Sequence, residues 1–165
     1  METLGELLER MRRGPELVSD AVAGATTAEL DFVPGAGRWT IRQIVAHLTD
    51  SEMVYSDRFR RVIAEDNPTL TVVDEKVWAA NLDYERRSPA EELQLIRLTR
   101  ARNSSLLSSL PSRAFERAGV HSERGRLTLL DLLRIYAEHA EGHARQIRGN
   151  RDAFAQVSKV ESTGL

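Results

Sequence analysis

Apolar residues recur at helical spacing through four long stretches of this chain, and that periodicity limits the possible fold more than any other feature of the sequence. The stretches cover residues 2–24, 41–65, 89–109 and 129–150. Amphipathic helices of this kind can bury their apolar stripes together only by packing side by side. The sequence therefore predicts an all-α fold, a four-helix bundle with a long connection between the second and third helices.

Capping residues mark the starts of three of these helices. Thr40 and Gln43 fit a capping box, in which each side chain satisfies an otherwise unpaired backbone N–H at the helix start. Ser88 precedes Pro89, a residue suited to the first helical position, and Thr128 precedes the last helix. Each of these three starts therefore has a local chemical signal.

Proline and glycine predict where the helices are interrupted. Gly14–Pro15 predicts a kink or a short break in the first helix. Residues 66–87 form the long connection, and there we expect a short helix near 74–82 that docks apolar side chains on the bundle, namely Trp78, Leu82 and Tyr84. Residues 112–127 have no helical period and suit a loop or a small hairpin.

The chain has 165 residues, which is enough for one sizeable hydrophobic core and too short for two ordinary domains. We expect residues 1–152 to form one bundle domain and residues 153–165 a weakly ordered C-terminal tail. The formal net charge of −2 provides no field strong enough to hold nucleic acid or an anionic membrane, so neither partner is expected. Because the N-terminus lacks the apolar core of a secretory signal and no stretch approaches a membrane span, we expect a cytoplasmic protein.

The chain has no cysteine, so nitrogen and oxygen atoms must supply any metal ligands. Three of the four histidines fall within predicted helices. His139 and His143 are four residues apart, so they project from one face of the last helix, together with the apolar residues Leu132 and Ile147. His47 lies on the apolar face of the second helix. All three imidazoles are therefore expected to point into the bundle.

Three inward histidines on two helices favour one shared metal ion over separate core histidines, each bonded to a nearby acceptor. We expect His47, His139 and His143 to bind a divalent ion. Imidazole suits zinc, nickel, iron(II), copper and cobalt, so the residues alone do not identify the metal. Three protein ligands leave a coordination position open, as is typical of a catalytic or substrate-binding site. The glutamate of the HExxH motif is missing between the two histidines of the last helix, so zincin chemistry is not supported.

Other polar residues near the histidines have weaker signals. Glu52 follows His47 by five residues and is a candidate general base or hydrogen-bond partner of a ligand, but a solvated surface glutamate is the favoured interpretation. Asp50 and Tyr136 are further candidates for hydrogen bonds to the ligands, with ordinary helix-face roles as the default.

The remaining candidates are predicted to be structural or exposed. His121 lies in a glycine-flanked loop, and an exposed loop histidine is favoured over one that reaches the site. Trp39 is predicted to anchor the core rather than to stack on a ligand. Several arginines are predicted to form a solvated basic face, namely Arg86, Arg87, Arg97, Arg100 and Arg102.

Two stretches carry a family resemblance, GRWTIRQIVAHLTDSE at 37–52 and LTLLDLLRIYAEHAEGHARQI at 127–147. Their most specific parts are Trp39, eight residues before His47, and the HxxxH of the last helix. With these features the chain resembles the DinB-like superfamily of small four-helix metalloproteins, which includes the YfiT-like proteins. The resemblance covers nearly the whole chain, from about residue 4 to residue 150.

This resemblance implies a bundle of unusual handedness, frequent homodimers and a divalent metal, often nickel or zinc, on the three matching histidines. In the family, water or substrate occupies the remaining coordination positions. Members with an assigned activity use the metal to activate a low-molecular-weight thiol such as bacillithiol, mycothiol or glutathione. For His47, His139 and His143 the resemblance therefore implies the same metal site that the residues themselves indicate.

Three functional hypotheses follow. The leading one is a metal-dependent enzyme that activates a low-molecular-weight thiol or water for transfer or hydrolysis of a small-molecule substrate. The alternative is a metal-binding stress or sensor protein without catalytic turnover. The third is a structural dimer whose histidines are ordinary core residues.

Overall fold

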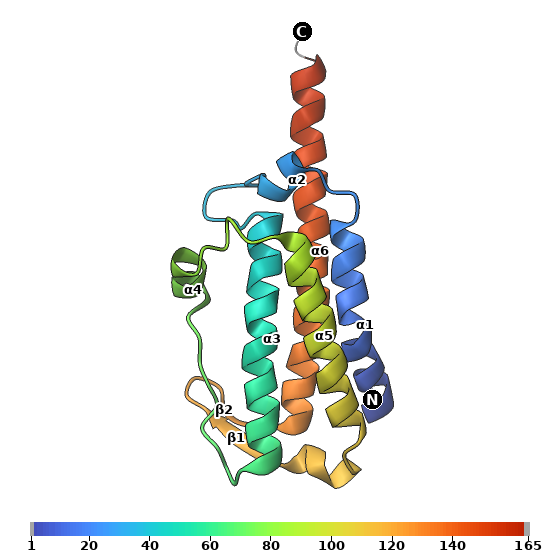
Figure 1. Ribbon diagram of the computed structural model, residues 1–165, viewed down its shortest axis with the longest axis vertical. Helices are drawn as coiled ribbons and strands as arrows, with labels where there is room; N and C mark the ends of the chain where they lie inside the picture. The colour runs from blue at the N-terminus through green and yellow to red at the C-terminus, as the bar shows by residue number, and fades with distance from the viewer. Residues whose placement is uncertain (1, 164–165) are drawn as a thin grey trace.

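The computed structural model describes residues 2–163, and its helices pack side by side as a bundle (Figure 1). The four long helices are α1 (Leu4–Val22), α3 (Ile41–Ala64), α5 (Pro89–Ser108) and α6 (Leu129–Thr163). The shorter elements are α2 (Thr27–Asp31), α4 (Glu75–Asn81), the 3-10 helix η1 (Ser112–Glu116) and the strands β1 (Ala118–His121) and β2 (Gly125–Thr128). The predicted four-helix bundle is confirmed.

The order of the helices around the bundle differs from their order in the sequence. α1 packs against α5 and α6, and α3 packs against the same two helices. The consecutive long helices α1 and α3 therefore lie diagonally opposite each other, whereas consecutive helices of a simple up-and-down bundle are adjacent. This topology places α3 directly beside α6, so residues far apart in the sequence share the α3–α6 interface.

Two apolar clusters fill the bundle, and a layer of small and polar residues separates them along every long helix. On α3, for example, the apolar residues of one cluster end at Leu48 and those of the other begin at Tyr55. Residues of this middle layer come from all four long helices and include Gly14, Glu52, Arg100 and His139, while His47 borders it beside Leu48. The layer is where the polar chemistry of the interior is concentrated.

Local signals account for most helix starts. Thr40 and Gln43 form the predicted capping box, and the Thr128 hydroxyl accepts a hydrogen bond from the Asp131 N–H at 3.0 Å. Ser88 occupies the N-cap of α5, but its hydroxyl makes no capping hydrogen bond, which corrects the prediction. Pro89 lacks an N–H, so one of the four backbone donors left unpaired at a helix start is already absent.

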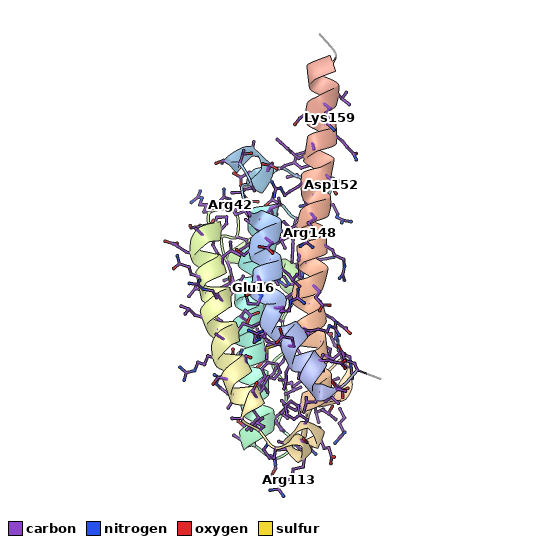
Figure 2. The ribbon with its side chains drawn as sticks, turned by 90° about the vertical axis from the view of Figure 1, so that its right-hand side faces the viewer. Glu16, Arg42, Arg113, Arg148, Asp152 and Lys159 are labelled. Carbon is purple, nitrogen blue, oxygen red and sulfur yellow. The ribbon has the colours of Figure 1, made fainter. Side chains whose placement is uncertain are left out.

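Of the predicted kink or short break at Gly14–Pro15, the structure shows the kink: α1 is continuous, and Figure 2 shows the helix changing direction at mid-helix. Proline removes one backbone hydrogen bond, but packing of α1 on α5 and α6 holds the helix on both sides of it.

The predicted end of the last helix near residue 150 is wrong. Residues 153–163, which we expected to form a weakly ordered tail, continue α6 beyond the rest of the bundle (Figure 1), and residues 164–165 lie outside the described part. The Phe154 ring packs edge-on against Phe32 with centroids 5.4 Å apart. Arg151 donates to the Ala23 carbonyl oxygen at 2.9 Å. These contacts with the α1–α3 connection support the helix past the predicted end.

The long connection between α3 and α5 is fastened to the hairpin of β1 and β2. Leu70 N–H donates to the Val120 carbonyl, and Val120 N–H donates to the Pro68 carbonyl. Gly119 is needed here, because a Cβ atom would lie 2.7 Å from the Leu70 side chain and 2.9 Å from the Pro68 oxygen. The predicted short helix forms as α4, but only Tyr84 of the three expected docking residues is fully buried, while Leu82 is exposed.

Across residues 2–163, no helix combines the length and apolar character needed to cross a lipid bilayer.

Candidate metal centre

Three imidazole rings from two helices converge where the middle layer meets one of the apolar clusters. The Nε2 atom of His139 lies 3.1 Å from Nε2 of His47 and 3.2 Å from Nε2 of His143. The three ligand atoms all lie within 4.8 Å of one another. His139 and His143 stand one turn apart on α6, whereas His47 reaches the same point from α3. The structure therefore brings together the three histidines that the sequence singled out.

The environment keeps these imidazoles neutral. Burial lowers the pKa of His47 to about 3, and repulsion from His143 adds to the effect. Burial is also the main cause that lowers the pKa of His139, well below its ordinary value, and that of His143. Neutral imidazole is the form that binds a metal ion.

Hydrogen bonding orients one of the rings. The side-chain oxygen Oε1 of Gln146 lies 2.9 Å from His143 Nδ1, so we assign the ring proton to Nδ1 and the free lone pair to Nε2. His139 Nε2 has one proton at most and faces two other Nε2 atoms, so hydrogen bonds among the rings cannot satisfy all three nitrogens. A cation that accepts three lone pairs satisfies them together. The donor set fits a divalent metal such as zinc or nickel.

Aromatic side chains surround the imidazoles. The Trp39 ring packs on His47 with centroids 4.9 Å apart, and its edge also meets Tyr84. On the opposite side, the Tyr55 ring lies 6.1 Å from the His139 ring. Trp39 is half-buried, so it anchors the start of α3 and at the same time holds the orientation of the His47 ring.

A cavity of about 370 Å³ opens beside the imidazoles. His47 and His139 line it, whereas its far wall comes from the hairpin and the α3–α5 connection. Its size suits a small molecule. The imidazole centre is therefore accessible from one side rather than enclosed by protein on all sides.

Asp50 supplies a carboxylate to this cavity. Its side chain is buried, and Arg87 Nη1 donates to Oδ1 at 2.8 Å. Within residues 2–163, the other oxygen, Oδ2, has no hydrogen-bond partner. Asp50 stands three residues after His47, so one turn of α3 places both side chains in the wall of the same cavity.

Glu52 corrects the prediction of a solvated surface glutamate, because only 1% of its side chain is exposed. Arg100 Nε donates to Oε1 at 3.0 Å, and Arg100 Nη2 donates to the same oxygen. The Tyr136 hydroxyl donates to Oε2. Both carboxylate oxygens are thus bonded inside the bundle, so Glu52 is not free to act as a general base. The Tyr136 hydroxyl therefore bonds to Glu52 and not to one of the three histidines.

Arg100 corrects the prediction of a solvated basic face. Its guanidinium carbon lies 3.7 Å from the Tyr136 ring centroid, and Nη1 donates to the Met11 carbonyl of α1. Gly14 makes room for it, since a Cβ there would lie 2.5 Å from Arg100 Nη1. A signal was present in the sequence: Ile96, Arg100, Asn103 and Leu107 share one stripe of α5. Arg87 is also paired with a carboxylate, that of Asp50. Arg86, Arg97 and Arg102 are exposed as predicted.

His121 also differs from its prediction as an exposed loop residue. It ends β1, is buried and lines the cavity. Its Nδ1 accepts hydrogen bonds from the Glu123 and Arg124 backbone N–H groups at 3.3 and 3.4 Å. The tight hairpin turns the imidazole inward, which the glycine-flanked sequence did not reveal. Two cavity arginines, Arg58 and Arg124, also carried no specific sequence signal.

Comparison with known proteins gives a consistent result. A sequence model of the DinB superfamily matches residues 10–147. The chain is 34% identical over 145 residues to "Putative metal-dependent hydrolase OB0782" of Oceanobacillus iheyensis, covering 87% of this chain and 83% of that protein. It is 32% identical over 134 residues to "Putative metal-dependent hydrolase YfiT" of Bacillus subtilis, covering 81% of this chain and 75% of that protein.

A solved structure of YfiT from Bacillus subtilis superposes on this fold with a TM-score of 0.87 at 27% sequence identity. The match covers 94% of this chain and 91% of the other. That protein is described as "a probable metal-dependent hydrolase with an unusual four-helix bundle topology". The diagonal placement of α1 and α3 is the feature of the present chain that departs from a simple bundle.

Proposed function

The chain belongs to the DinB superfamily, and from this membership and the geometry of its imidazoles we propose that it is a metal-dependent hydrolase with a divalent ion on His47, His139 and His143. Nickel and zinc are the favoured ions, with iron or manganese as alternatives. The substrate is a small molecule that enters the cavity beside α3.

One observation carries this proposal: three neutral imidazoles converge at the wall of an accessible cavity of about 370 Å³. A structural zinc site usually takes all four ligands from the protein and is closed, whereas three protein ligands leave a position for water or substrate. An ion that only stabilised the fold would not need a cavity beside it. The named hydrolases among the relatives support the same reaction class.

A divalent ion bound here would supply Lewis acidity, which makes water or a thiol nucleophilic near neutral pH. Asp50 is the residue that we propose to accept the proton of the nucleophile, because its carboxylate lines the same cavity as His47 and His139. Arg87 fixes the Asp50 carboxylate through Oδ1. Trp39 and Gln146 hold the rings of His47 and His143 in place.

A low-molecular-weight thiol is the alternative nucleophile, and it would lead to transfer rather than hydrolysis. The chain has no cysteine, so any thiol must come from solution. A homodimer, implied by the family resemblance, and a cytoplasmic location, expected from the sequence, remain predictions. The metal-binding stress or sensor protein differs from both enzymes in having no turnover.

Metal analysis of the purified protein, loaded in turn with nickel and zinc, tests the centre. We expect one ion per chain in the wild type and loss of that ion in His143→Ala. His121→Ala is the matched control, because this buried histidine lines the cavity but lies outside the triad. Unchanged metal content in His143→Ala would remove the proposed site.

A panel of esters, amides and electrophiles, assayed with and without added thiols, then separates the reactions. Conversion without thiol supports the hydrolase, and conversion only with thiol supports the transferase. Stoichiometric metal without any conversion supports the stress or sensor protein and contradicts the enzyme.

A further inference from the structure

A second polar group lies in the wall of the same cavity, away from the imidazoles, and consists of Arg58, His121 and Arg124. Arg58 follows His47 by eleven residues, which is about 16 Å along the axis of α3. Side chains of a helix lean toward its N-terminus, so Arg58 extends back toward the imidazole centre. Its guanidinium carbon lies 5.2 Å from the centroid of Tyr55, the ring that packs beside His139.

The positive charges of this group are not neutralised locally. Among residues 2–163, neither Arg58 nor Arg124 forms an ion pair with a carboxylate. Burial lowers the pKa of Arg58, and repulsion from Arg124 contributes to the same shift. Arg58 donates from Nε to the Thr71 carbonyl at 2.9 Å, which holds the side chain in place without compensating its charge.

The tautomer of His121 adds a second observation. Because Nδ1 accepts two backbone N–H groups, the ring proton belongs on Nε2. His121 Nε2 lies 3.5 Å from Arg58 Nη2, which uses one of its two hydrogens to donate to the Thr71 carbonyl, so the other hydrogen and the His121 N–H are two donors in the cavity wall. An acceptor oxygen between them would take a hydrogen bond from each. The repulsion from the two arginines, which adds to burial in lowering the pKa of His121, is also relieved by a negative group.

The carboxylates of the cavity do not fill this role. Asp50 is paired with Arg87. Glu75, Glu123 and Glu138 line the cavity too, but their side chains are exposed, and solvent screens their charges. Apolar side chains also line the cavity, including Val54, Leu127 and Ile135.

We propose that Arg58, His121 and Arg124 form a carboxylate-binding subsite, and that the substrate is a small molecule with an anionic carboxylate at one end. An apolar spacer crosses the cavity to the bond that reacts at the imidazole centre. The claim that the other end of the substrate reacts at the imidazoles depends on the proposed metal-dependent function. The carboxylate subsite depends only on the contacts of its own residues and is testable without a metal.

Hydroxamates, which chelate metal ions, test the two ends together in the zinc-loaded protein. Linear hydroxamates of increasing chain length are compared with versions that carry a terminal carboxylate, and dissociation constants are measured by calorimetry. At one chain length we expect the carboxylate to tighten binding about tenfold, as for a charge-assisted hydrogen-bonded pair. Arg58→Gln should abolish this gain and leave the binding of the uncharged series unchanged.

Arg124→Gln is the second variant, because this exposed residue has no packing role that would endanger folding. Arg126→Gln is the control: it removes a charge from the same hairpin, at a residue outside the cavity wall, and should retain the gain. A carboxylate that gives no gain at any length, or a gain that persists in both Arg58→Gln and Arg124→Gln, overturns the proposal.

A separate measurement uses the EDTA-treated full-length protein, so that failure of the metal centre is distinguishable from failure of the subsite. Pentanoate and the uncharged pentanamide are titrated while the backbone amide NMR signals of Glu123 and Arg124 are followed. These N–H groups donate to His121 and report on its surroundings. Pentanoate should shift both signals saturably and pentanamide should not. Equal or absent shifts contradict the carboxylate subsite whatever the metal content.

Discussion

Glu52 of α3 and Arg100 of α5 form an ion pair inside the bundle, where 1% of each side chain is exposed. The Tyr136 hydroxyl of α6 donates to the same carboxylate, and Arg100 donates to the Met11 carbonyl of α1. All four long helices therefore meet in one polar network. The network also borders the histidines, because repulsion from Arg100 contributes, after burial, to lowering the pKa of His139.

Glu52→Gln should destabilise the fold by about 3–5 kcal/mol, because it leaves the Arg100 guanidinium buried without a counter-charge. Denaturant unfolding measures the change. Arg100→Met, which leaves the Glu52 carboxylate buried without its partner, should also be destabilising. Arg97→Met replaces an exposed arginine of the same helix α5, so it is the matched control and should have little effect.

The double variant Glu52→Leu with Arg100→Met gives a further check. It should be more stable than either single variant, since apolar replacement of a buried pair removes both desolvated charges. Additive losses would contradict the coupling of the two residues.

Gly14→Ala should destabilise the protein by about 1–3 kcal/mol, although alanine is the better helix former. The new Cβ would lie 2.5 Å from Arg100 Nη1 and 3.0 Å from the Ala140 Cβ. Gly5→Ala in the same helix meets no atom within 4 Å and should leave the melting temperature equal or higher. If both variants melt alike, the close approach of Arg100 to α1 is wrong.

Acid should destabilise the metal-free protein. The pKa of His47 is about 3 in the folded state and near 6.5 in the unfolded chain. Between these two pH values the imidazole is protonated in the unfolded chain but not in the folded protein. The contribution of His47 to stability is complete above pH 6.5 and falls by up to about 1.4 kcal/mol per pH unit as the pH decreases toward 3. Unfolding of EDTA-treated protein across this range should show the decline. His47→Gln should make it shallower, and an unchanged slope would argue against a buried neutral His47.

Asp50→Asn should lower kcat for any substrate that the panel identifies by about a hundredfold, because the amide cannot accept the proton. Metal content should stay the same, since the residue lies outside the triad. Glu138→Gln, an exposed carboxylate of the same cavity, is the matched control and should retain activity. Full activity in Asp50→Asn would assign the proton transfer to another group.

Much of the fold was accessible from local patterns. Helix periodicity, the Thr40 capping box and the prolines that end helices act over a few residues, so they predict α3 almost to its last residue. The His139–His143 pair was accessible for the same reason, since four residues along a helix always place two side chains on one face. The end of α6 could not be predicted from local pattern, because Arg151 and Phe154 support the helix through contacts with residues distant in the sequence.

By itself, the sequence determined the helices, the inward face of each one and the three histidines that suit a metal ion. Only the tertiary structure decided which polar side chains share the interior. Glu52, Arg100 and His121 all changed from predicted surface residues to buried ones. The physical reason is that burial of a charge depends on its partner, and the partners of Glu52 and Arg100 lie on other helices. Helix order, not local pattern, places α3 beside α6 and creates the centre.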